Sequence, residues 1–160
     1  AVLSNSTVNV SSGNVSIVSG AGKADLTNTT LNSTAGAVSV TAQGGDLTLG
    51  AGNISAVNDI TLNASGKADL TNGTLNSSSG AVSVTAQGGD FLLGAGNISA
   101  VNNITLNASG KADLTNGTLN SSSGAVSVTA QGGDLTLGAG NISANSTVGL
   151  NSGGNITLNG

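Results

Sequence analysis

The pentapeptide Lys23-Ala-Asp-Leu-Thr recurs at Lys67 and at Lys111, so the chain repeats itself every 44 residues (67 − 23 = 111 − 67 = 44). Two successive units, residues 67–100 and 111–144, are identical except at positions 91 and 92. Self-similarity at a fixed period indicates an array in which one structural unit is stacked along an axis. Such an array offers a repeated surface rather than a unique pocket.

Each 44-residue unit divides into two similar halves, and each half holds three short apolar segments. The runs Val82–Ala86 (VSVTA) and Ile104–Ala108 (ITLNA) are equivalent and lie 22 residues apart (104 − 82 = 22). Their strict alternation of apolar and polar residues predicts strands, because successive side chains of a strand point to opposite faces. The abundance of Gly, Ser, Thr and Asn argues against helices.

These patterns predict an all-β fold, a right-handed parallel β-helix (β-solenoid) with about 22 residues per coil, three short strands per coil and roughly seven coils. A left-handed triangular solenoid is built from hexapeptides and favours shorter coils. At about 4.8 Å per coil, seven coils give a rod of roughly 34 Å. We expect residues 1–160 to form a single β-solenoid segment, which is a fragment of a longer repetitive shaft.

The alternation also predicts which side chains form the core. In two consecutive coils the inward residues should be Leu70, Leu75, Val82, Val84 and Ala86, followed by Phe91, Leu93, Ile98, Ile104, Leu106 and Ala108. Stacking should place Val82 in one column with Val38, Ile60 and Ile104. Leu92 takes an outward position that Thr48 and Thr136 hold elsewhere, so it should expose a small apolar spot.

Composition excludes several classes of function. The net charge is −4 and only three residues are basic, so the chain lacks the positive surface that nucleic acid requires. No apolar run is long enough to span a membrane, and we expect no membrane insertion. Because His, Cys, Arg and Glu are absent, general acids, bases and nucleophiles are nearly lacking, and we predict no catalytic residues and no enzymatic activity.

Six of the seven Asp residues recur at steps of 21 and 23: Asp25, Asp46, Asp69, Asp90, Asp113 and Asp134. We expect them to stack in one column, about 5 Å apart, where solvent, hydrogen bonds or cations must offset their repulsion. Each Asp could hold backbone amides at a corner, and a Lys two residues before alternate Asp residues could neutralise half of the column. Alternatively, Gly-Gly-Asp could bind calcium through Asp46, Asp90 and Asp134, although its spacing differs from known calcium-binding β-solenoid repeats. No other cofactor is expected.

Of the 21 Asn residues, 17 are followed two positions later by Ser or Thr. This tripeptide is the acceptor of N-linked glycans, usually on an exposed surface. The candidate attachment sites are Asn28, Asn53, Asn72, Asn76, Asn97, Asn116, Asn120 and Asn141. Ser and Thr are so common here that many matches arise by chance. Asn could instead form amide ladders at solenoid corners or occupy left-handed backbone positions.

The segments GNISAVNNITLNA (96–108) and GAVSVTAQGGDLTL (124–137) resemble the filamentous-haemagglutinin repeats of bacterial adhesins and exoproteins that are secreted by the two-partner route. The resemblance extends over nearly the whole chain, as a pattern of apolar alternation with Gly, Asn and Asp corners. It implies a right-handed β-helical shaft, export to the cell surface or medium, and roles in adhesion, biofilm cohesion or presentation of a tip. Some members of that family carry glycans on Asn.

The predicted function is therefore the structural shaft of an extracellular or cell-surface filamentous adhesin, without catalysis. The alternative is a self-assembling extracellular filament or matrix protein built by end-to-end stacking of β-solenoids. The expected partners are other coils of the same protein, further copies joined end to end, and host or matrix carbohydrate.

Overall fold

The computed structural model describes residues 1–159, which form 21 strands and no helix. The strands make three parallel sheets of seven strands each. The first sheet holds β1 (Thr7–Val10), β4 (Thr30–Ser33), β7 (Asn53–Ala56), β10 (Thr74–Ser77), β13 (Asn97–Ala100), β16 (Thr118–Ser121) and β19 (Asn141–Ala144). The second holds β2 (Val15–Ser19), β5 (Val38–Ala42), β8 (Ile60–Ala64), β11 (Val82–Ala86), β14 (Ile104–Ala108), β17 (Val126–Ala130) and β20 (Val148–Ser152). The third holds β3 (Ala24–Asp25), β6 (Leu47–Thr48), β9 (Ala68–Asp69), β12 (Phe91–Leu92), β15 (Ala112–Asp113), β18 (Leu135–Thr136) and β21 (Ile156–Thr157).

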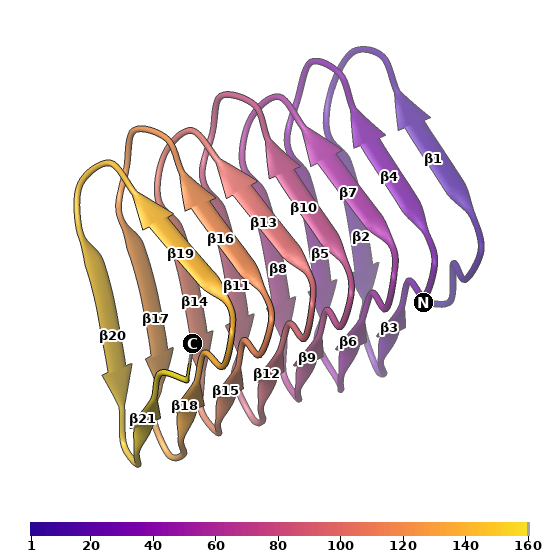
Figure 1. Cartoon of the computed structure of the whole chain (residues 1–160). Coiled ribbons are helices and arrows are strands. Elements are labelled where there is room, and N and C mark those ends of the chain that lie inside the picture. The colour runs from indigo at the N-terminus through magenta and orange to yellow at the C-terminus, as the bar shows by residue number, and fades with distance from the viewer. Residues whose placement is uncertain (160) are drawn as a thin grey trace.

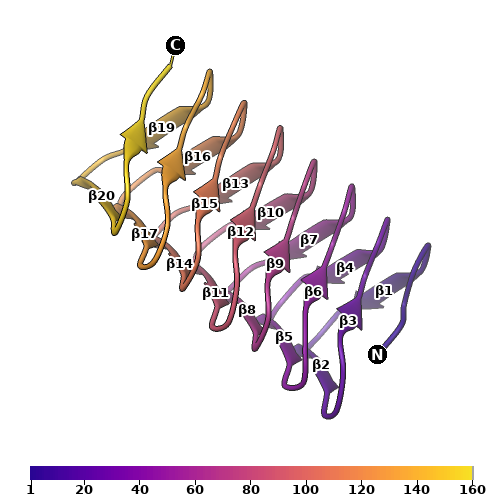
Figure 2. The same cartoon turned by 90° about the horizontal axis from the view of Figure 1, so that it is seen from below.

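The chain visits the three sheets in turn and advances by one strand in each, so it winds as a right-handed solenoid from β1 at one end to β21 at the other (Figure 1). Seen from below, the short strands of the third sheet form one side of the rod, and the two longer sheets lie behind it (Figure 2). The predicted fold class, with three strands per coil and about seven coils, is confirmed.

The coils come in two lengths, because two of the three corners vary. Between β10 and β11 four residues lie outside the strands (78–81), but between β13 and β14 only three do (101–103). The corner from the second to the third sheet changes in step, with four residues after β11 (87–90) and three after β14 (109–111). Coils that begin with β1, β4, β10 and β16 are therefore long coils, and those that begin with β7, β13 and β19 are short coils.

The core consists of aliphatic columns parallel to the rod axis. All eleven side chains expected to point inward in the two consecutive coils are buried, and Val82 pairs in register with Ile60 and Ile104. A column of the third sheet was not predicted, in which Ala alternates with a larger residue. There Phe91 lies between Ala68 and Ala112 and is 1% exposed. The small neighbours leave room for the aromatic ring.

Leu92 is half-buried, in register between Asp69 and Asp113, so the apolar spot expected there is only partly exposed.

Within residues 1–159 the structure has no helix of the length and hydropathy needed to cross a membrane.

Candidate functional site

The Asp residues lie in two columns, and the prediction of a single column of six carboxylates was wrong. Asp69 pairs in register with Thr48 and Leu92. The same register aligns Lys67, two residues earlier, with Asp46 and Asp90. The reason is that the spacing of the Asp residues and the spacing of the third-sheet strands alternate in opposite order. The sequence steps by 21 from Asp25 to Asp46, whereas the third sheet steps by 23 over the same interval, from Ala24 to Leu47.

One of these columns therefore alternates Lys with Asp and the other alternates Asp with Thr or Leu. Both arrangements keep carboxylates of one column two coils apart, about 9.6 Å. At that distance the repulsion between solvated carboxylates is weak, since it approaches the screening length of a physiological salt solution.

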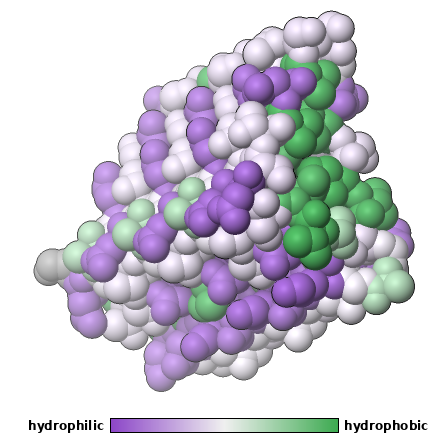
Figure 3. Space-filling model, turned by 90° about the vertical axis from the view of Figure 1, so that its right-hand side faces the viewer, coloured by the Kyte–Doolittle hydropathy of each residue, from purple (hydrophilic) through white to green (hydrophobic). Residues whose placement is uncertain are grey.

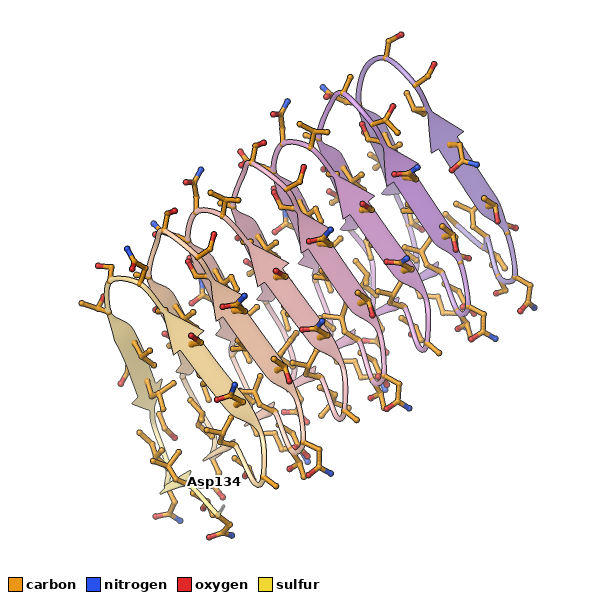
Figure 4. All side chains as sticks on the ribbon, turned by 45° about the horizontal axis from the view of Figure 1, so that its top comes forward. Asp134 is labelled. Carbon is orange, nitrogen blue, oxygen red and sulfur yellow. The ribbon has the colours of Figure 1, made fainter. Side chains whose placement is uncertain are left out.

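Asp46, Asp90 and Asp134, the candidate calcium ligands, each hold a backbone amide of the following coil. Their Oδ1 atoms accept hydrogen bonds from the backbone N–H of Lys67 (2.9 Å), Lys111 (2.9 Å) and Asn155 (2.7 Å). Asp134 lies near the C-terminal end of the rod, where it is labelled in Figure 4. The expected role of these Asp residues at corners is confirmed. Among residues 1–159 no three acidic side chains are grouped closely enough to hold a metal ion.

Asp25 and Asp69 accept hydrogen bonds from Thr residues two positions later. The Oδ1 atom of Asp25 accepts from the Oγ1 atom (2.8 Å) and the backbone N–H (3.2 Å) of Thr27. These two bonds, with help from Lys23, lower the pKa of Asp25 to about 2. Partial burial raises the pKa of Asp69, but the hydrogen bonds from Thr71 and the charge of Lys67 together outweigh it, so the net shift of the pKa is downward.

The predicted pairing of each Lys with the Asp two residues later is confirmed for two of the three Lys residues. The Nζ atom of Lys23 lies 3.4 Å from Asp25 Oδ2, and that of Lys67 lies 3.5 Å from Asp69 Oδ2. No such ion pair joins the remaining Lys to Asp113 in the part of the chain that the structure describes. Because the Lys side chains of both pairs are exposed to solvent, the pairs add little to stability.

A row of buried Ser residues was missed by the sequence analysis. Ser33, Ser77 and Ser121 end the first-sheet strand of their long coils, where short coils have Ala. The Ser77 hydroxyl donates to the Asn58 carbonyl (2.7 Å) and accepts from the Gly80 N–H (2.9 Å). The hydroxyl thus provides hydrogen-bond partners for backbone groups at the four-residue corner, which has one residue more than the corner of a short coil. The sequence feature that could have predicted these buried hydroxyls is the alternation of Ser with Ala two residues after an inward Leu or Ile.

Every candidate glycosylation site is exposed. Asn53, Asn97 and Asn141 begin first-sheet strands and share their column with Thr residues. Asn76 and Asn120 lie in the adjacent outward column of the same sheet, where they alternate with Ser. The flat outer face of the first sheet therefore presents Asn and hydroxyl side chains in two parallel rows (Figure 4).

The remaining candidates, Asn28, Asn72 and Asn116, have φ of 55°, 62° and 63°. In the register they share a corner column with Ala51, Ala95 and Ala139. The left-handed Gly50, Gly94 and Gly138, with φ of 54° to 58°, lie one position earlier, against Thr27, Thr71 and Thr115. Asn and Gly are the residues that adopt this left-handed conformation most readily. The expected left-handed Asn is confirmed. Within residues 1–159 an amide ladder exists only at the first step of this column, where Asn28 Nδ2 donates to Asn5 Oδ1 (3.3 Å), since Ala interrupts the column afterwards.

Two hollows lie on the outer face of the second sheet, near the ends of its strands. One, of about 280 Å³, is lined by Thr41, Ala42, Gln43, Asn63, Ala64, Ser65 and Gln87. The other, of about 220 Å³, is lined by the equivalent residues 44 positions later: Thr85, Ala86, Gln87, Asn107, Ala108, Ser109 and Gln131. Each hollow forms where a short Ser stands between two long Gln side chains of the neighbouring coils.

No protein-family model, curated protein or solved structure matches this chain.

Proposed function

We propose that the chain is a shaft segment of an extracellular or cell-surface filamentous adhesin of the filamentous-haemagglutinin type, and that it has no catalytic role. The observation that carries the proposal is the unbroken register of all three sheets over seven strands. A stack of coils without an inserted loop or break suits a rod that holds other parts of a protein at a distance.

The chemistry of the surface supports the same proposal. Its outward columns consist mainly of Ser, Thr, Asn and Gln, and charged residues make up 6% of the chain. The acidic groups that are present hold corner amides or hydroxyls, and they are spread along the rod. A surface of this kind is hydrated along its whole length and offers no cluster of reactive groups.

Surface location is tested by applying antibodies raised against residues 1–160 to intact source cells. Labelling before permeabilisation is expected for a shaft of a surface protein. Labelling that appears only after permeabilisation would contradict the proposal. A cytoplasmic protein of the same cells, probed in parallel, controls for leakage.

We also propose that some of the exposed Asn residues carry N-linked glycans. The intact mass of the source-derived protein should fall after enzymatic removal of N-linked sugar, and peptide mapping should place the sugar on first-sheet residues such as Asn53 or Asn97. An unchanged mass would leave these side chains with a purely structural role.

The second candidate is a filament built from copies joined end to end, and the apolar end faces favour it. Figure 3 looks onto the N-terminal end of the rod, where apolar side chains gather inside a polar rim. Val2 and Val18 at that end are 70% and 58% exposed, and Leu158 at the other end is 61% exposed. Uncovered edges of parallel sheets are templates for pairing with another chain.

One contact opposes simple stacking of two copies. The segment Ala1–Leu3 already extends the third sheet beyond β3, through hydrogen bonds to Asp25. If β1 of a second copy paired with β19, its Ala1–Leu3 segment would need the position that β21 occupies. Negative-stain microscopy separates the two candidates, since a shaft gives discrete lengths and a filament gives open-ended fibres.

A further inference from the structure

We propose that the hollows on the second sheet form a repeating binding track for a neutral, extended polysaccharide. This inference does not depend on the role of the chain as a shaft. It rests on the two hollows, which share Gln87 as a common wall and have the same set of lining residues.

The lining residues determine the class of ligand. Each hollow is bordered by the amides of two Gln and one Asn and by Thr and Ser hydroxyls, with no charged side chain. Amides and hydroxyls both donate and accept hydrogen bonds, which matches the hydroxyl groups of a sugar. A charged ligand would find no opposite charge in the lining to compensate for its desolvation.

The polar groups of the hollows are free to bind. In residues 1–159 no hydrogen bond to another residue uses the side chains of Gln43, Asn63 or Gln87. Ser65 makes one long bond, 3.4 Å, to the Gly45 carbonyl. The side chains are therefore solvated in the unbound protein, and a ligand exchanges their water for its own hydroxyls at little cost.

The size and spacing of the hollows favour an extended chain over a compact ligand. At about 280 and 220 Å³, both hollows are smaller than the pockets of about 300–1,000 Å³ that usually hold a drug-sized ligand. Gln43, Gln87 and Gln131 recur every two coils, about 9.6 Å. A pyranose ring in an extended β-linked chain advances by nearly the spacing of one coil, so two rings fit each interval between Gln side chains.

The test is a titration of the isotope-labelled chain 1–160 with a β-linked glucose hexasaccharide and with a β-linked N-acetylglucosamine hexasaccharide, followed by NMR. We expect at least one of the two sugars to shift the side-chain amide signals of Gln43, Asn63 and Gln87 saturably, with a dissociation constant in the millimolar range. A sulfated hexasaccharide should bind more weakly, because the lining offers no positive charge.

Gln87→Ser is the informative variant, because it removes the wall that both hollows share. Ser65 and Ser109 already occupy this column in the neighbouring coils, so the substitution should leave the fold intact. Two lost hydrogen bonds should weaken binding about tenfold. Gln87→Glu, which keeps the shape and removes the amide donor, should also weaken it.

The matched control is Asn76→Ser, which changes an exposed amide on the first sheet, away from the hollows, and should leave the affinity unchanged. The proposal is overturned if neither neutral sugar gives a saturable shift. It is equally overturned if Gln87→Ser binds as tightly as the unchanged chain while its circular dichroism spectrum is retained, or if the shifts occur on the first sheet instead.

Discussion

The buried hydroxyl of Ser77 offers a direct test of how the long coils are closed. Ser77 is 2% exposed, and its hydroxyl joins the Asn58 carbonyl of the preceding coil to the Gly80 N–H of its own corner. Ala fits the same space, because Ala56 and Ala100 are its neighbours in the column. Ser77→Ala therefore removes two hydrogen bonds without creating a steric clash or a large cavity.

The expected cost of Ser77→Ala is about 2–3 kcal/mol, of which about 1 is the lost bond to Asn58 and the remainder is the buried Gly80 N–H left without an acceptor. With a urea m-value of about 2 kcal/mol/M, the unfolding midpoint should fall by about 1–1.5 M. Far-ultraviolet circular dichroism is the suitable readout, because the chain has one Phe and no Trp or Tyr.

Ser79→Ala is the matched control, since Ser79 is exposed at the same corner and its hydroxyl makes no hydrogen bond to a described residue. Its cost should stay below about 0.5 kcal/mol. If the transition is not two-state, hydrogen exchange of the Gly80 amide gives the local answer and should accelerate only in Ser77→Ala. Equal midpoints and equal Gly80 protection in the two variants would refute the role assigned to the hydroxyl.

Three further substitutions test the core, a corner and a carboxylate. Phe91→Leu introduces the residue found at this place in equivalent coils and should lower the free energy of unfolding in urea by about 1 kcal/mol. Phe91→Ala should lower it by about 3–5 kcal/mol, because only this substitution leaves a large cavity. Equal costs would contradict the packing described. Asn72→Ala should cost about 1 kcal/mol and Asn72→Gly almost nothing, since φ is 62°; a destabilised Gly variant would show that the Asn side chain matters. Ionised Asp25, with its lowered pKa, contributes stability that is complete above its ordinary pKa of about 3.9 and is lost as the pH falls toward 2. Thr27→Val should raise this pKa and reduce the acid-dependent loss, as measured by NMR titration and by unfolding at several pH values.

The sequence was sufficient for the strands and for most of the core. VSVTA and ITLNA alternate strictly, and a strand has only two faces, so the inward positions of Val82 and Ile104 follow directly. Their separation of 22 residues gives the stacking partner in the second sheet without ambiguity. The left-handed corner position of Asn72 was also interpretable, since Asn and Gly adopt a positive φ most readily.

The pairing partners within the columns of the third sheet could not be predicted from alternation. Its strands have two residues each, which is too short for alternation to fix a register. Alignment by residue type placed Asp46 beside Asp69, whereas the actual neighbour of Asp46 is Lys67. The deciding fact is the location of the two additional residues in each long coil, one at each variable corner. Corners of three and of four Gly-, Ser- and Asn-rich residues look alike in sequence. The hollows beside Gln87 depend on the same three-dimensional register.

The hollows on the outer face of the second sheet repeat every second coil, and this period predicts how binding depends on ligand length. Inward columns of this sheet hold an apolar residue in every coil, such as Val82 and Ile104, whereas Gln43, Gln87 and Gln131 recur only every second coil. A ligand along the rod therefore meets an identical set of amides at intervals of about 9.6 Å. A trisaccharide can occupy one hollow, and a hexasaccharide can reach two.

Because the second hollow is engaged at a high effective concentration, the hexasaccharide should bind at least about tenfold more tightly than the trisaccharide. Gln87→Ser should abolish most of this advantage, since it removes the wall between the two hollows. A hexasaccharide that binds only twofold more tightly, as expected from the number of equivalent positions alone, would show that the hollows act independently and do not form a track.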